Sequence, residues 1–197
     1  MIPQLATIFG SKTKAQEIVF LLNKAKKVVR QGFYESELAK VIEFCEKNKL
    51  TLVKSKFKVL LADEEAYSNK GIRIENTDQR KGMYFVYISK DEKAAWLASY
   101  QELVGNDSEL GQILGYPACC VDFFCKRFSD DNPNLQLKPI NAFTNLTKRN
   151  QDCVLLSHFP CSSSCEESIE LAKKYGVIIS SIDSARATEM MNLLRVT

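Results

Sequence analysis

The stretch from Asp152 to Ser168, DCVLLSHFPCSSSCEES, concentrates reactive side chains more than any other part of the sequence. It contains the only histidine of the protein, His158, followed three and seven positions later by Cys161 and Cys165. Serine and glutamate residues at its end form a capping pattern that predicts a helix over about 164–175. The stretch therefore predicts a loop carrying thiol and imidazole groups that leads directly into a helix.

A second cysteine cluster, GYPACC at 115–120, lies upstream of this stretch. Pro117 fits the first position of a helix over about 117–128, which places Cys119 and Cys120 in the first turn. Free N–H groups and the helix dipole favour negative charge at such a position. Thiols there are expected to titrate lower and to serve better as metal ligands or nucleophiles. We interpret the two clusters as halves of one site.

The combined clusters supply a set of metal-binding side chains. The candidate ligands are Cys119, Cys120, His158, Cys161 and Cys165. Three or four of them suit a tetrahedral Zn²⁺ site or, with thiolates dominant, an iron–sulfur cluster. Adjacent residues of a helix diverge by about 100°, which leaves open whether both cysteines of the pair bind one metal. The other three cysteines, Cys45, Cys125 and Cys153, are interpreted as buried core residues.

The same residues permit an alternative without a metal. Cys161 or Cys119 would then act as a nucleophile, with His158 as the general base of a thiol enzyme. A third interpretation assigns no chemistry at all: the cysteines are buried, and the histidine satisfies backbone groups. The pattern leaves the reaction, the substrate and the question of catalysis open.

Basic residues are concentrated near the N-terminus. Residues 1–60 contain twelve Lys and Arg against five Asp and Glu, although the whole chain is nearly balanced at 27 against 24. Lys54, Lys56 and Lys58 alternate with apolar residues in a predicted strand over 51–61. This face supports a further alternative, a nucleic-acid-binding module, while a solvated sheet surface explains the same lysines. The sequence contains no phosphate-binding glycine motif.

Hydrophobic periodicity predicts an α+β fold. N-terminal helices and a three-stranded antiparallel sheet are expected to pack against a mostly helical C-terminal half that carries the Cys/His site. We expect a single domain, 1–197, with an α/β subregion at 1–105 and a helical subregion at 106–197. Trp96 is expected to anchor its helix to the sheet. Further helices are predicted at 13–30, 37–48, 90–104, 108–114 and 183–195, and extended segments at 71–75, 82–88 and 177–179.

Composition is typical of a soluble globular protein, with 45% apolar and 26% charged residues. The seven cysteines cannot all pair, which argues against a disulfide framework. No apolar run approaches the ~20 residues of a membrane span, and the N-terminus lacks a signal-peptide pattern. We therefore expect a cytoplasmic protein that acts on a small molecule or a protein and has no membrane partner.

The two cysteine motifs resemble a known sequence pair. LGYPACCVDFF at 114–124 and SHFPCSSSCEES at 157–168 resemble the signature of an uncharacterised, mainly archaeal family catalogued as a domain of unknown function. The resemblance covers about residues 80–175, and all five candidate ligands match its pattern. It implies a shared site at these residues, and the family brings no established activity.

Overall fold

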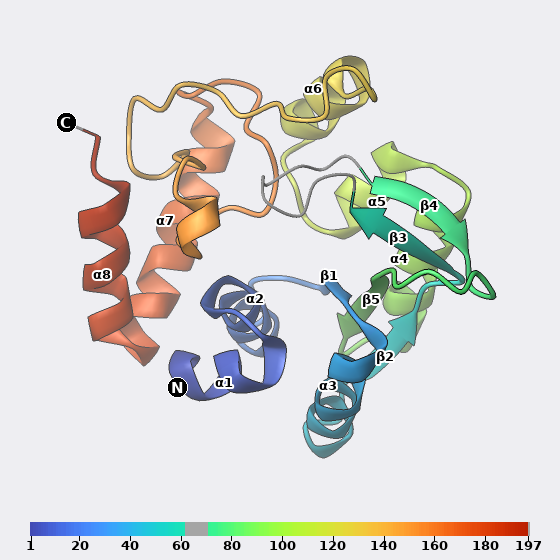
Figure 1. The fold of residues 1–197 in the computed structure, drawn as a ribbon. Coiled ribbons are helices and arrows are strands. Elements are labelled where there is room, and N and C mark those ends of the chain that lie inside the picture. Colours follow the sequence, from blue (N-terminus) through green and yellow to red (C-terminus); the bar gives the residue numbers. More distant parts are fainter. Residues whose placement is uncertain (62–70, 197) are drawn as a thin grey trace. The chain divides into compact units, whose positions relative to one another are not determined.

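The chain folds into two compact units that are not contiguous in sequence. A computed structural model describes residues 1–61 and 71–196 (Figure 1). One unit, here called the cysteine unit, combines residues 1–25 with residues from 116 onward, and residues 26–115 form the other, here called the sheet unit. The division differs from the expected subregions because the first two helices belong with the C-terminal part. The expectation of a single domain stays a prediction.

The predicted α+β class is confirmed, and most predicted helices are present. Five of them lie within a few residues of their expected bounds: α3 (Glu35–Lys47), α4 (Glu92–Leu103), α5 (Asp107–Ile113), α6 (Ala118–Arg127) and α8 (Ser184–Leu194). None of the helices within residues 1–61 and 71–196 combines the length and apolar character that crossing a membrane requires.

The sheet unit is built around a central strand. Strand β5 (Tyr84–Ser89) pairs antiparallel with β1 (Val28–Phe33) on one side and with β2 (Thr51–Lys54) on the other. Its Val86, Tyr87 and Ile88 are fully buried, as expected for the middle of a covered sheet. Helix α4 packs on all three strands, and α5 packs on α4.

One strand prediction needs correction. Segment 51–61 is not one strand: β2 ends at Lys54, and β3 (Phe57–Leu61) pairs with β4 (Gly71–Glu75) in a separate two-stranded sheet. Ser55 makes the corner, because its hydroxyl donates to the carbonyl of Phe57 and accepts the N–H of Phe85. A polar side chain that satisfies backbone groups allows the strand to break there.

The predicted helix over 13–30 is also too long. Helix α2 (Lys12–Leu22) ends early, Lys24 takes a left-handed conformation with φ of 60°, and Val28–Arg30 belong to β1. Adjacent β-branched Val28 and Val29 favour the strand over a continued helix. The helical spacing of apolar residues across this region was therefore misleading.

Trp96 does not anchor α4 to the sheet. Its side chain is 50% exposed, whereas Ala94, Ala95 and Ala98 are buried on the opposite side of the helix. Small alanines let the helix backbone approach the sheet closely, so the large ring lies on the outer face. The prediction for Trp96 was wrong, since a large aromatic side chain is not always buried.

The cysteine unit is an assembly of helices. Helix α1 (Ile2–Phe9) packs on α2, α2 packs on α7 (Glu166–Ile182), and α7 packs on α8. The rings of Phe20 and Tyr175 stack with their centroids 4.0 Å apart. Helix α7 does not end at Gly176, and the predicted extended segment 177–179 is helical. Its buried side continues across the glycine at helical spacing, through Ser168, Ala172, Tyr175 and Ile179.

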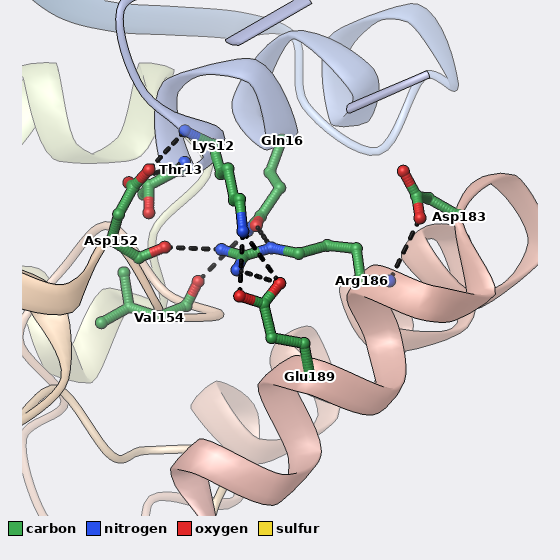
Figure 2. Close-up of polar contacts among 8 residues, drawn as sticks. All are labelled: Lys12, Thr13, Gln16, Asp152, Val154, Asp183, Arg186 and Glu189. Atoms are coloured by element: carbon green, nitrogen blue, oxygen red, sulfur yellow. Dashed lines mark hydrogen bonds and ion pairs between the residues drawn. The ribbon is translucent and has the colours of Figure 1, made fainter. Parts of the chain in front are cut away.

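A buried polar network joins the start of the Cys/His stretch to α2 and α8 (Figure 2). The Asp152 carboxylate accepts the backbone N–H groups of Lys12 and Thr13, which begin α2. Arg186 of α8 is 4% exposed, and it donates to Gln16 Oε1 and to the carbonyl oxygen of Asp152. These bonds fix the chain at Asp152, nine residues before Cys161.

Candidate metal centre

Four cysteine sulfurs from two helix N-termini meet at one point. Cys119 and Cys120 lie in the first turn of α6, Cys161 lies in the preceding loop of α7, and Cys165 is the N-cap of α7. All four Sγ atoms lie within 4.8 Å of one another. The Sγ of Cys165 is 3.7 Å from that of Cys119 and 3.6 Å from that of Cys120.

Both adjacent cysteines reach the same centre. Their Sγ atoms are 3.8 Å apart, although the two residues diverge around the helix. Pro117 is the N-cap of α6, so Cys119 and Cys120 lie at the very start of the helix. Both side chains can there point toward the N-terminal end of the helix axis. Their position in the first turn therefore lets both sulfurs lie within the same cluster.

The spacing of the sulfurs fits the ligand shell of a single ion. A Zn–S bond of about 2.3 Å gives a sulfur–sulfur edge of about 3.8 Å in a tetrahedron. The three sulfur pairs among Cys119, Cys120 and Cys165, at 3.6, 3.7 and 3.8 Å, match that edge. Cys119, Cys120, Cys161 and Cys165 could therefore hold one metal ion without a large rearrangement.

The four thiols differ in burial and hydrogen bonding. Cys120 and Cys165 are buried, whereas Cys161 is partly accessible and Cys119 is exposed. The backbone N–H of Cys161 donates to Cys120 Sγ at 3.3 Å, and Ser168 Oγ lies 3.2 Å from the same sulfur. Cys120 is thus the most enclosed member of the cluster.

His158 lies behind the cluster rather than within the group of four sulfurs. Its ring is buried, and its Nε2 is 2.9 Å from Ser168 Oγ. The ring centroids of His158 and Tyr116 are 5.0 Å apart. Ser168 was interpreted from the sequence as a capping or turn residue. Its spacing of three positions from Cys165 places it on the same helix side, a signal that could have linked it to the site.

The thiol pKa values agree only in part with the sequence prediction of low values at helix starts. Loss of water around the sulfur atoms raises the pKa of both Cys119 and Cys120. Burial also acts to raise the pKa of Cys165, but hydrogen bonds from Ser168, Cys120 and Cys161 together outweigh it and lower that pKa to about 7. The Cys165 thiolate therefore forms most readily of the three, and its charge adds, by repulsion, to the increase in the pKa of Cys119 and Cys120 that loss of water mainly causes. A divalent cation would remove that repulsion.

The remaining cysteines were predicted to be buried, and two of them are. Cys45 and Cys153 are 1% and 0% exposed. Cys125 is exposed, so its predicted burial was wrong. Helix α6 buries only Cys120 and Val121, and Cys125 lies about 140° around the helix from Cys120. Its position explains both its distance from the cluster and its exposure.

The three lysines of the nucleic-acid hypothesis do not share one face. Lys54 ends β2, pairs with Glu35 at 3.4 Å and lies over the Tyr84 ring. Lys58 is buried in β3, where its ammonium group donates to the backbone carbonyls of a neighbouring turn. Lys56 is exposed between the two sheets. Nucleic-acid binding itself stays a prediction.

Comparison with known proteins agrees with the resemblance seen in the motifs. The family profile described as "Protein of unknown function (DUF483)" matches residues 96–194, a range that contains all four clustered cysteines. No curated protein and no solved structure matches the chain. The mainly archaeal distribution and the motif pair as a family signature stay predictions. The chain therefore belongs to the DUF483 family, whose function is not known.

Proposed function

We propose that Cys119, Cys120, Cys161 and Cys165 bind one Zn²⁺ ion and that this centre holds the cysteine unit in its folded state. The observation that carries the proposal is the match between the sulfur–sulfur distances and the edge of a zinc–thiolate tetrahedron. Four cysteine ligands are typical of closed structural zinc sites, whereas catalytic sites keep one position for water or substrate.

A single ion fits the cluster better than an iron–sulfur centre. In a [4Fe–4S] cluster each cysteine binds a different iron, and the irons and sulfides lie between the thiolates. That arrangement needs wider separations than the 4.8 Å within which all four sulfurs lie. Tetrahedral coordination by four thiolates is typical of zinc, and a single iron ion would adopt the same geometry.

The packing of α6 supports a structural role for the ion. This ten-residue helix buries only Cys120 and Val121. An isolated helix of this length is marginal in water, and two buried side chains provide little hydrophobic stabilisation. Metal–thiolate bonds to α6 and to the start of α7 would supply what packing does not, as in small zinc domains.

Metal analysis of the purified full-length protein tests this function. We expect one zinc per chain after purification under reducing conditions, no visible absorption band, and release of zinc by a strong chelator. Bound iron with a visible absorption band would show that the ion in this centre is iron instead of zinc. Zinc-free protein that also fails to bind added Zn²⁺ would contradict it. A single rapidly alkylated cysteine in such protein would favour the metal-free thiol enzyme.

A further inference from the structure

The four thiolates of the proposed zinc centre are not equivalent toward reagents in solution. Cys120 is buried and has two potential donors, the Cys161 N–H and the Ser168 hydroxyl. Cys119 is exposed, and its Sγ contacts the sulfurs of Cys120 and Cys165. Within the described part of the chain, no backbone N–H or hydroxyl group donates to Cys119 Sγ.

The direction of the bonds around Ser168 follows from the chemistry of a bound metal. A metal-bound thiolate has no proton, so the Ser168 hydroxyl must donate to Cys120 Sγ. The Ser168 oxygen then accepts the hydrogen bond of 2.9 Å from His158. The His158 Nε2 atom therefore carries the proton. His158 therefore holds Ser168 in the orientation that serves Cys120, as outer groups do at many metal sites.

Hydrogen bonds and exposure have opposite effects on a thiolate. Donated hydrogen bonds withdraw charge from sulfur and make it a weaker nucleophile, while burial keeps reagents away. A bare and exposed thiolate retains its charge and meets oxidants first. In this centre Cys120 is the buried, hydrogen-bonded thiolate, and Cys119 is the bare, exposed one.

We propose that Cys119 is the oxidation site of the zinc centre, and that hydroperoxides attack it first and thereby release the metal. This inference rests on the proposed zinc-binding function. Oxidation removes two of the four zinc ligands. The centre is then a thiol switch between a zinc-bound state, in which α6 is folded, and a metal-free state.

The reaction balances with hydrogen peroxide as the oxidant. The Cys119 thiolate attacks one peroxide oxygen, the O–O bond breaks, and the product is a sulfenic acid with hydroxide as the leaving group. A second thiolate then attacks the sulfenic sulfur, a disulfide forms, and a second hydroxide leaves. With two protons from solvent, two thiolates and one peroxide give one disulfide and two waters. The two remaining cysteines hold zinc weakly.

Geometry selects the partner of Cys119 in the disulfide. Cys120 is unsuitable because consecutive Cα atoms are about 3.8 Å apart, below the ~4.4 Å minimum of ordinary disulfides. Cys165 Sγ is 3.7 Å away on the other helix start. Cys161 also lies within the 4.8 Å cluster. The disulfide should therefore join Cys119 to the 157–168 segment.

Peroxide treatment of the zinc-loaded, full-length protein tests the proposal. Zinc content is measured first, so a zinc-free sample contradicts the proposed function rather than this inference. Dimedone is added with hydrogen peroxide to trap sulfenic acid, and a chelating dye follows zinc release. We expect early dimedone labelling of Cys119 to exceed that of Cys120 by ~10-fold or more. Without dimedone, peptide mapping should show Cys119 joined to Cys161 or Cys165.

Ser168→Ala keeps all four proposed ligands and removes the donor to Cys120. Ser164→Ala, at an exposed position in the loop before α7, is the control. We expect Ser168→Ala to bring Cys120 into the early labelling and to accelerate peroxide-driven zinc release by ~3-fold or more. Ser164→Ala should behave as wild type. Equal labelling of all four cysteines in the zinc-loaded wild type, or earliest labelling at Cys120, Cys161 or Cys165, would overturn the inference. An unchanged Ser168→Ala pattern would also overturn it.

Discussion

Cys120 and Cys125 lie on the same short helix, yet only one of them reaches the cluster. The sequence suffices to separate them, because their angular difference of about 140° places them on different sides of α6. It does not predict that Cys125 is exposed, since the phenylalanines around it suggested a core. Burial depends on what packs against a helix, and α6 has few neighbours inside its own unit.

This pair provides a matched test of the ligands. Cys120→Ser should lower zinc affinity by ~100-fold or more, because it removes a thiolate from the coordination shell. Cys125→Ser should leave zinc affinity unchanged, because Cys125 is exposed and outside the cluster. Competition with a chelator of known affinity measures both. Equal losses in the two variants would contradict the assignment of ligands.

At the scale of elements, we expect the proposed zinc centre to matter most for α6. Removing zinc with a chelator should speed backbone hydrogen exchange across α6, because its two buried side chains cannot hold it in place. Exchange in α8 should change little, since α8 packs along α7. Mass spectrometry of exchanged peptides measures both helices. Unchanged protection of α6 after verified zinc removal would contradict a structural role for the centre.

The contact between β5 and α4 predicts a pH dependence in the sheet unit. Glu102 accepts hydrogen bonds from Tyr87 and Arg30. Burial raises the pKa of Glu102, but the attraction of Arg30 and these hydrogen bonds outweigh it, so its pKa is lowered. The stabilisation is therefore complete above the unfolded pKa of about 4.3 and is lost as pH falls through the lower folded value.

Glu102→Gln isolates that effect. The free energy of unfolding of the wild type should fall more steeply below about pH 5 than that of Glu102→Gln. Urea unfolding, followed by fluorescence of the single tryptophan on α4, measures this difference. Parallel curves for the two proteins down to pH 3 would show that Glu102 does not contribute in this way.

Elements were predictable where a local signal agreed with the packing. Capped helices such as α4 and α5 lie close to their expected bounds, because Asp91 and Asn106 side chains accept backbone N–H groups at their starts. β1 and the second half of α7 were missed. Each depends on a partner distant in sequence: β1 needs β5, and α7 needs α2 and α8 to cover its buried side across Gly176.

At the scale of the whole molecule, the N-terminal helices are joined to the C-terminal part by Arg186. Its guanidinium group contacts Gln16, the Asp152 carbonyl and Glu189. This discontinuous unit was not predictable, because no local pattern indicates that residues separated by more than a hundred positions share a network. The location of the four-cysteine cluster was predictable, since its members lie in two short motifs.

Arg186→Met tests the contribution of this network. The change removes the charged donor while keeping much of the side-chain volume, and it leaves Gln16 and the Asp152 carbonyl without that partner. We expect the cysteine unit to lose about 2–4 kcal/mol of unfolding free energy, visible as faster exchange in α2 and α8. Arg195→Met, at an exposed position, should change stability by less than about 0.5 kcal/mol. A similar small effect of both substitutions would contradict a structural role for Arg186.

X-ray absorption spectroscopy at the zinc edge of the full-length protein tests the central claim most directly. Binding by Cys119, Cys120, Cys161 and Cys165 predicts four sulfur scatterers at about 2.3 Å and no nitrogen or oxygen ligand. A shell containing nitrogen at about 2.0 Å would place His158 on the metal instead of behind Ser168. A shell of oxygen and nitrogen without sulfur would contradict the proposed centre altogether.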